Sequence, residues 1–352
     1  MYVKFSQQLL NWYDDNGRDL PWRVKNYAGR QNIAPDPYHV WLSEIMLQQT
    51  VVATVKDYYA KFTQKWPNVQ ALATAQQDEV LTAWAGLGYY ARARNLHKCA
   101  QYICSEFGGN FPNSETILLT LPGVGPYTAA AIAAIAFDLN ANVVDGNIER
   151  IFSRVEKLED ELPAAKAKIY KIAKKYLPTA RYGDYAQALM DLGTAICRPK
   201  NPKCDICPIA EFCVLAGAEN VQNYPKKTPK KPKKQLKTNV FWVKNAKNDQ
   251  VLLQKRPEKG LLGNMMEFPS SPWLPQKPAE VQAKNLGLIT HIFTHIKLEM
   301  QVWEMAEPEF ETLVNGGFEV NLSADKQWVK PNELDGFALP SLMQKVRKLA
   351  ET

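Results

Sequence analysis

The sequence predicts a mainly α-helical N-terminal domain followed by a smaller α+β domain. The chain has 352 residues, more than one average domain needs, and 46% of them are hydrophobic, which suffices for ordinary cores. Up to about Asn223, apolar residues recur every three or four positions, whereas from Thr238 they form short runs rich in β-branched and aromatic residues. We therefore expect domains at residues 1–223 and 238–352, joined by a linker at 224–237.

The helical spacing in the first domain occurs in separate stretches, at residues 5–13, 40–62, 78–86, 93–107 and 185–196. Prolines and glycines separate these stretches, at Pro67, Gly86, Gly88, Pro112, Pro122 and Pro163. In the second domain we expect strands within 238–244, 250–256, 287–305 and 326–330. A final helix is expected at 341–350.

The positive charge of the chain is concentrated in the linker. Residues 226–237 contain seven lysines and no acidic residue, which equals the formal net charge of +7 of the whole chain. Two interpretations are open for this Lys/Pro run: a solvated spacer between the domains, or a segment that follows phosphates without reading sequence.

The N-terminal sequence lacks a charged start followed by an apolar signal core. In addition, no apolar run approaches the ~18 residues that are needed to span a membrane. We therefore expect a cytoplasmic protein that has no membrane contact.

Four of the six cysteines form one short cluster, C-x6-C-x2-C-x5-C, made by Cys197, Cys204, Cys207 and Cys213. This spacing predicts a metal site in a reducing compartment rather than a disulfide framework. Four thiolates suit either tetrahedral zinc or an iron-sulfur cluster, and the ligand type alone leaves both open.

The sequence LPGVG at residues 121–125, followed by Pro126, predicts a helix-hairpin-helix at about 115–137. Gly123 and Gly125 permit positive φ and close approach, and Pro126 suits the first helical position. Backbone N–H groups at a helix start bind phosphate oxygens, which favours DNA binding; a plain turn between two helices would use glycine too.

Two carboxylates are candidates for catalysis. Asp145 precedes the amphipathic run IERIFSRV, so it can be a helix N-cap, and a carboxylate at the positive end of a helix stays ionised. Glu44 lies among apolar residues in WLSEIMLQQT, where its pKa should be raised if the side chain faces inward. The alternative for Glu44 is a solvent-facing helix glutamate.

Several long motifs resemble known proteins. LPGVGPYTA, VVDGNIER and the cysteine loop after MDLGTAIC resemble the helix-hairpin-helix DNA glycosylases of the endonuclease III superfamily. WLSEIMLQQT and GLGYYARARNLHK are most similar to adenine DNA glycosylases of the MutY type. The resemblance implies a [4Fe-4S] cluster rather than zinc, and a monomeric base-excision-repair enzyme. Its expected substrate is double-stranded DNA that contains adenine opposite 8-oxoguanine or guanine.

The resemblance also implies the catalytic roles. Glu44 would protonate adenine at N7 and later activate water, Asp145 would stabilise the sugar cation or capture it covalently, and Tyr127 and Asn147 would position the water and the carboxylates. Bifunctional members of the superfamily carry a nucleophilic lysine where this chain has Tyr127. A monofunctional glycosylase is therefore expected.

The target base must be flipped out of the duplex to reach these groups. The resemblance implies DNA contacts by Gln49 and Tyr89, with Leu87 beside them, although turn or core packing could account for each. It also implies a base-pocket strip of Arg18, Trp22 and Arg23. A stretch at 24–36, directly after Arg23, is longer than the family pattern.

Residues 238–352 resemble the Nudix-like domain of this glycosylase family, and they lack the G-x5-E-x7-R-E-x2-E-E run that binds Mg²⁺ in Nudix hydrolases. A reader of 8-oxoguanine is therefore expected. Phe293, Thr294 and His295 resemble the family's Phe-Ser-His triplet, whose hydroxyl can accept from the N7–H of 8-oxoguanine. The threonine methyl puts a close fit in doubt, and an alternating β-hairpin could account for Phe293.

Two other functions are kept as alternatives. One is an endonuclease III type glycosylase-lyase for oxidised pyrimidines, against which Tyr127 and the additional C-terminal domain argue. The other is a non-enzymatic DNA-binding protein with a structural zinc site.

Overall fold

The computed structural model describes residues 1–24, 34–229, 231–245 and 247–352. These residues form two compact units, Met1–Thr74 with Lys98–Pro229, and Ala75–His97 with Lys230–Thr352. The segment Ala75–His97 therefore groups with the C-terminal part of the chain, whereas the sequence suggested one uninterrupted helical domain.

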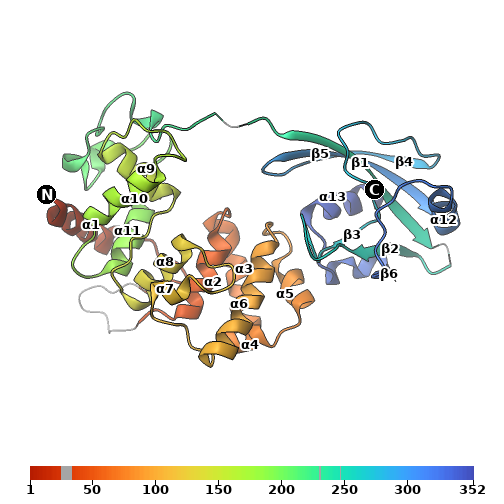
Figure 1. Cartoon of the computed structure of the whole chain (residues 1–352), viewed down its shortest axis with the longest axis horizontal. Helices are drawn as coiled ribbons and strands as arrows, with labels where there is room; N and C mark the ends of the chain where they lie inside the picture. The colour runs from red at the N-terminus through yellow and green to blue at the C-terminus, as the bar shows by residue number, and fades with distance from the viewer. Residues whose placement is uncertain (25–33, 230, 246) are drawn as a thin grey trace. The chain divides into compact units, whose positions relative to one another are not determined.

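The first unit is helical, as the apolar spacing predicts (Figure 1). Its helices are α1 (Tyr2–Asn16), α2 (Pro37–Leu47), α3 (Val52–Lys65), α4 (Val69–Ala73), most of α6 (Ala91–Phe107), α7 (Glu115–Leu118), α8 (Pro126–Phe137), α9 (Gly146–Val155), α10 (Lys166–Lys175) and α11 (Tyr182–Ala195). Short 3-10 turns follow at η1 (Cys204–Ile206), η2 (Ala210–Phe212) and η3 (Val221–Asn223).

One predicted helical stretch, 40–62, is two helices. α2 ends at Leu47 and α3 begins at Val52. Gln49 between them has a positive φ of 59°, a left-handed conformation that no α-helix accommodates. The apolar periodicity runs across this break, so the sequence pattern alone did not reveal it.

The alanine-rich helix α8 lies at the centre of the first unit. Its residues from Thr128 to Ala136 are all buried, and it packs against α2, α7 and α11. Small side chains permit this close approach. On α11, a Cβ on Gly183 would lie only 2.7 Å from the carbonyl oxygen of Ala134, so this contact requires glycine. Close packing around α8 positions the ends of α2, α9 and α11 relative to one another.

The second unit is built around a mixed sheet with strand order β3-β2-β1-β5-β4 among the described residues, with β6 pairing β2. Its elements are α5 (Gln77–Trp84), β1 (Lys234–Asn245), β2 (Gln250–Lys255), β3 (Met266–Glu267), β4 (Lys284–Ile292), β5 (Ile296–Ala306), α12 (Glu307–Asn315), β6 (Lys326–Val329), η4 (Pro331–Gly336) and α13 (Ser341–Ala350). β1 and β5 are parallel, and the other pairs are antiparallel. This is the α+β architecture that the sequence predicts.

The two faces of the sheet have separate cores. Val240 and Trp242 of β1 face the core that α13 covers, and Phe241 and Val243 face the core that contains Phe310 of α12. The sequence analysis did not predict α12 or the short strand β3. Burial on both faces explains why residues 240–243 of β1 are all apolar.

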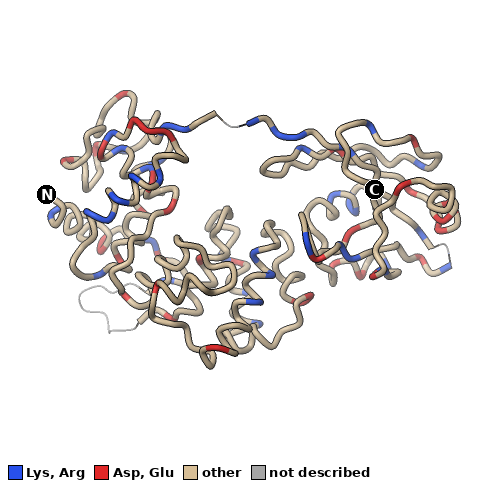
Figure 2. Tube along the Cα trace, in the orientation of Figure 1, with Lys and Arg blue, Asp and Glu red and all other residues tan. Residues whose placement is uncertain are grey.

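The linker is shorter than the sequence predicted. β1 begins at Lys234, inside the expected linker, and the amide of Lys234 donates to the carbonyl of His295. Figure 2 shows lysines along the chain that leads into this strand. Among the described residues, no helix combines the length and the apolar character that crossing a bilayer requires.

Candidate active site and cysteine centre

A cleft of about 560 Å³ opens in the first unit between α2, α8, α9, α11 and the N-terminal segment. Its walls include all the residues that were predicted to act in catalysis or in the base pocket, together with the predicted DNA contact Gln49: Arg18, Trp22, Arg23, Glu44, Gln49, Tyr127, Asp145 and Asn147. These residues are scattered over the first 147 positions of the chain, and the packing of the helices brings them together.

Glu44 projects from α2 into the cleft and is buried. The hydroxyl of Tyr127, from the first turn of α8, donates to its Oε2 over 2.6 Å. Burial raises the pKa of Glu44, while the bond from Tyr127 and the charge of Arg23 lower it and Asp145 raises it further. The expected inward orientation and the raised pKa are therefore both found, and the solvent-facing alternative is wrong.

Asp145 is the N-cap of α9, as expected. Its Oδ1 accepts from the amides of Asn147 over 2.9 Å and Ile148 over 2.7 Å, and its Oδ2 accepts from Asn147 Nδ2 over 2.9 Å. Burial nevertheless raises the pKa of Asp145, and these three bonds only oppose that rise. The position at a helix terminus predicts an ionised carboxylate, but it does not include the effect of desolvation, which raises the pKa of Asp145.

The base-pocket strip lies on one wall of the cleft. The Trp22 side chain is buried, and its ring packs edge-on against Tyr59 with centroids 5.2 Å apart. Arg18 and Arg23 both form ion pairs with Asp191 of α11. Residues 25–33 of the predicted 24–36 insertion lie outside the described residues.

The hairpin before α8 differs from the prediction at one glycine. Gly123 has a positive φ of 76°, which favours glycine. Gly125 has a φ of −94° as the N-cap of α8, so left-handed backbone does not explain it. A Cβ there would meet nothing within 4 Å, which leaves the backbone open to a group outside the chain. Pro126 occupies the start of the helix, as predicted.

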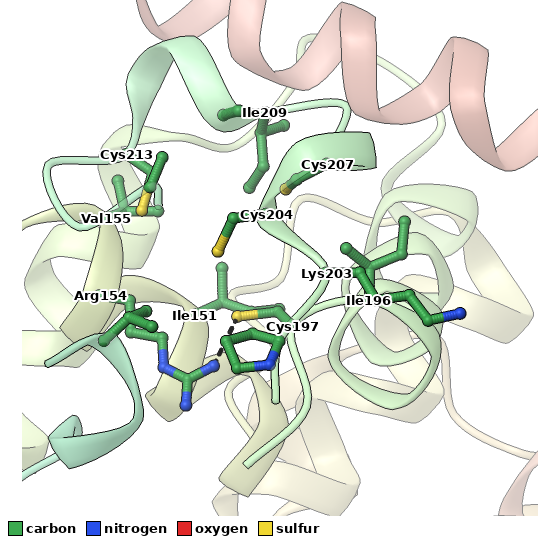
Figure 3. A pocket seen from close by; sticks show the side chains of 14 residues that line it. Ile151, Arg154, Val155, Ile196, Cys197, Lys203, Cys204, Cys207, Ile209 and Cys213 are labelled. Carbon is green, nitrogen blue, oxygen red and sulfur yellow. Dashed lines mark hydrogen bonds between the residues drawn. The ribbon is translucent and has the colours of Figure 1, made fainter. Parts of the chain in front are cut away.

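The four clustered cysteines line one pocket between α9 and the loop after α11 (Figure 3). Arg154 of α9 is buried there and donates to the Cys197 sulfur over 3.3 Å. In the described part of the chain, no three Cys, His, Asp or Glu side chains are grouped as ligands of a single ion. Four cysteine side chains around one shared pocket can hold a cluster of several atoms.

The predicted DNA-contact residues differ in exposure. Gln49 is exposed at the break between α2 and α3. In the second unit, Leu87 is only 5% exposed, which supports its packing interpretation, whereas Tyr89 is 48% exposed with a φ of 50°. An exposed aromatic ring on left-handed backbone is a stronger candidate for contact with DNA than a buried leucine.

Residues 293–295 connect the antiparallel strands β4 and β5, so the predicted hairpin is present. Phe293 packs against the core and stacks on Trp273 with centroids 5.8 Å apart, while Thr294 and His295 are exposed. The Thr294 hydroxyl lies 3.0 Å from the hydroxyl of Tyr89. Packing therefore accounts for Phe293, and Thr294 and His295 remain the accessible residues of the loop.

Three buried polar residues were not predicted from the sequence: Arg150, Gln187 and Asp191. Gln187 lines the cleft from α11. Arg150 of α9 donates to Asn147 Oδ1, to the Gly193 carbonyl and to the Cys197 carbonyl. A signal was present: Gln187 and Asp191 are polar residues four positions apart on one helical face, in the apolar stretch from Ala186 to Leu192.

Three family models match parts of the chain. Residues 42–179 match the model of the HhH-GPD superfamily base excision DNA repair proteins, 197–213 match the iron-sulfur binding domain of endonuclease III, and 239–349 match the NUDIX domain. The adenine DNA glycosylase of Homo sapiens is 35% identical over 97% of this chain and 73% of its own length. That of Buchnera aphidicola subsp. Schizaphis graminum is 33% identical over 99% of both chains.

Among solved structures, a thermostable thymine-DNA glycosylase superposes with a TM-score of 0.54 and 29% identity, over 60% of this chain and 95% of that one. The match at 197–213 and the pocket lined by Cys197, Cys204, Cys207 and Cys213 agree on a [4Fe-4S] cluster in this loop. The helical fold, the cysteine centre and the near full-length similarity lead to one assignment: this chain belongs to the adenine DNA glycosylase family of base-excision-repair enzymes.

Proposed function

We propose that this enzyme removes adenine mispaired with 8-oxoguanine, or with guanine, by hydrolysing the N-glycosidic bond without cleaving the strand. The observation that carries the proposal is the pairing of two carboxylates, the buried Glu44 and the partly buried Asp145, in one cleft that also contains Tyr127. Such a pair can supply a proton donor on one side of the scissile bond and a negative charge on the other.

Glu44 is suited to be the acid. Burial raises its pKa, so the carboxyl retains a proton at a higher pH than an exposed glutamate would. A flipped adenine in the cleft would accept this proton at N7, which turns the base into a better leaving group. The deprotonated Glu44 would then take a proton from the attacking water.

Asp145 is suited to stabilise the sugar. Asn147 and Ile148 fix its carboxylate through three hydrogen bonds, so little reorganisation is needed when positive charge develops on the sugar. Asp145 would either stabilise that cation or capture it covalently before water attacks.

The absence of an amine in the cleft supports a monofunctional reaction. A lyase of this superfamily needs a primary amine to form a Schiff base with the sugar. Among the cleft residues in the described part of the chain there is no lysine, and the Tyr127 hydroxyl is bonded to Glu44. Water is then the remaining nucleophile, and the product is an abasic site.

The second unit would read the base opposite the adenine. Thr294 is exposed at the tip of the β4–β5 hairpin, where its hydroxyl could accept from the N7–H of 8-oxoguanine. Glu267 is buried and bonded to Gln254 and Arg256, so this carboxylate is not available for Mg²⁺. We infer that this domain recognises the opposite base and does not act as a hydrolase. We also infer that the protein is cytoplasmic and acts as a monomer.

The [4Fe-4S] cluster would cross-link the cysteine loop to the helical fold through its four thiolate ligands. The chain's own residues continue that connection, because Arg154 contacts the Cys197 sulfur and Arg150 contacts the Cys197 carbonyl. Both arginines come from α9, the helix that Asp145 caps.

Product analysis on four duplexes tests the proposal. Adenine is placed opposite 8-oxoguanine, guanine, thymine or cytosine, and the products are separated with and without alkali. We expect fast excision opposite 8-oxoguanine, slower excision opposite guanine, and strand breaks only after alkali. Breaks without alkali would contradict the monofunctional reaction, and equal excision in all four duplexes would contradict mismatch specificity.

A further inference from the structure

Asp191 is a buried carboxylate of α11 to which the proposed mechanism gives no role. Its side chain is 1% exposed, and it accepts three hydrogen bonds from the N-terminal segment. The Arg18 amide donates over 2.8 Å, Arg18 Nε over 2.6 Å and Arg23 Nη1 over 2.8 Å. A carboxylate removed from water to this extent is costly unless cations pair with it, and here two guanidinium groups do.

Arg23 connects this ion pair to the proposed acid. Its side chain is 6% exposed, and it lines the cleft together with Glu44. Tyr13, Glu44 and Asp191 face Arg23, while Tyr127, Arg23 and Asp145 face Glu44. The positive charge of Arg23 lowers the pKa of Glu44, in opposition to burial and to Asp145.

This arrangement has a physical consequence for a proton donor. Glu44 must be protonated before it can donate, and a buried guanidinium without a counter-charge would favour the ionised carboxylate. A carboxylate within hydrogen-bond distance of the guanidinium opposes its field, because the two groups carry opposite charges of equal size. Asp191 therefore reduces the effect of Arg23 on Glu44.

We propose that Asp191 is a positioning residue for adenine excision: it holds Arg18 and Arg23 at the cleft wall and balances the Arg23 charge, so that Glu44 keeps the proton it donates. This role rests on the proposed function, in which Glu44 is the acid. A purely structural role, in which Asp191 only ties residues 18–23 to α11, makes a different prediction.

The test is the pH dependence of single-turnover excision by Asp191→Asn, purified with its cluster, on adenine opposite 8-oxoguanine. Asparagine retains a hydrogen-bond acceptor but carries no charge, so Arg23 acts on Glu44 without compensation. We expect the basic limb of the profile to move to lower pH. The rate at neutral pH should fall by about tenfold or more, since general acid catalysis contributes about 10²–10⁴-fold, and the deficit should narrow in acid.

Asp184→Asn is the matched control. Asp184 is another buried carboxylate of α11 and pairs with Arg181 over 2.9 Å, outside the cleft. This variant should lose stability without moving the basic limb. A loss of rate in Asp191→Asn by one factor at every pH would overturn the proposed role and leave a structural one.

A second pair of variants keeps the test decisive if Asp191→Asn does not fold. Arg23→Gln removes the guanidinium and should move the basic limb to higher pH, because the charge of Arg23 lowers the pKa of Glu44. Adding Asp191→Asn to Arg23→Gln should move the limb back to lower pH, and an unmoved limb would overturn the proposal. Normal excision by Glu44→Gln would contradict the proposed function itself. A pH-independent loss of rate in Asp191→Asn would instead contradict only the proposed role of Asp191, so the two failures can be told apart.

Discussion

Arg150 donates a hydrogen bond of 2.9 Å from Nη2 to the side-chain oxygen of Asn147. The same guanidinium donates from Nε to the Cys197 carbonyl over 2.8 Å, so one side chain joins the support of Asp145 to the first cysteine of the cluster loop. A planar, multidentate donor suits this position, whereas lysine could not reproduce both contacts.

Replacing Arg150 with glutamine should therefore impair both catalysis and the cluster loop. Hydrogen bonds from charged groups contribute about 1.5–3 kcal/mol each, so single-turnover excision should fall by roughly 10- to 100-fold. Visible absorbance of the cluster would report its retention in the same preparation. Lys171→Gln removes a positive charge from α10 as a control. Equal losses of excision rate in the two variants would show that the effect of Arg150→Gln comes from the change in net charge alone.

Glu44→Gln and Asp145→Asn should each abolish excision while binding to the mismatched duplex persists. Glutamine cannot donate a carboxyl proton, and asparagine can still cap α9 but carries no charge toward the sugar. Single-turnover kinetics and a binding titration measure the two properties separately. Glu149→Gln, in the first turn of α9, is the matched control, and near-normal excision by either test variant would remove that residue from the mechanism.

Tyr127→Phe should move the basic limb of the pH–rate profile to higher pH. The Tyr127 hydroxyl bonds to Glu44 Oε2 and lowers the pKa of this carboxyl, so its removal raises that pKa further. An acid with a higher pKa remains protonated to higher pH, which fixes the sign of the shift. A limb that stays in place would show that the Tyr127 hydroxyl does not control the protonation of the acid.

Gly193→Ala should displace Asn147. A Cβ at Gly193 of α11 would lie 2.6 Å from the Asn147 Cβ and 3.3 Å from Arg150 Nη2. Overpacking of this kind costs about 1–3 kcal/mol, so both the melting temperature and the excision rate should fall. Gly336→Ala introduces the same methyl where nothing lies within 4 Å and should change neither. An unaffected excision rate in Gly193→Ala would show that α11 can shift to admit the methyl.

Thr294→Ala should reduce the preference for 8-oxoguanine over guanine by about 2- to 10-fold, the range expected for one neutral hydrogen bond of about 0.5–1.5 kcal/mol. Thr294→Ser retains the hydroxyl and should keep the preference. The readout is the ratio of excision rates on the two mismatches, with Thr290→Ala on β4 as the control. Equal preference in Thr294→Ala and the unaltered enzyme would assign recognition to other residues.

The sequence predicted those features that depend on local chemistry. Asp145 precedes an amphipathic run and forms the N-cap of α9, and four cysteines within a short span line a common pocket. Capping and ligand spacing involve residues close in sequence, so local pattern was sufficient. The resemblance of long motifs to a known family also identified Glu44 and Tyr127 as site residues. Local chemistry alone would have assigned them to a helix surface or to the core.

Only the tertiary structure decided the arrangements that depend on packing between distant segments. Asp191 bonds to Arg23 across 168 positions of sequence, and β1 begins at Lys234 because it pairs with β5 rather than because its composition changes. The left-handed backbone at Gln49 and the extended backbone at Gly125 also differ from what periodicity and glycine content predict. Sequence patterns report which faces are apolar, whereas the partner of each buried polar group is set by the approach of separate helices and strands.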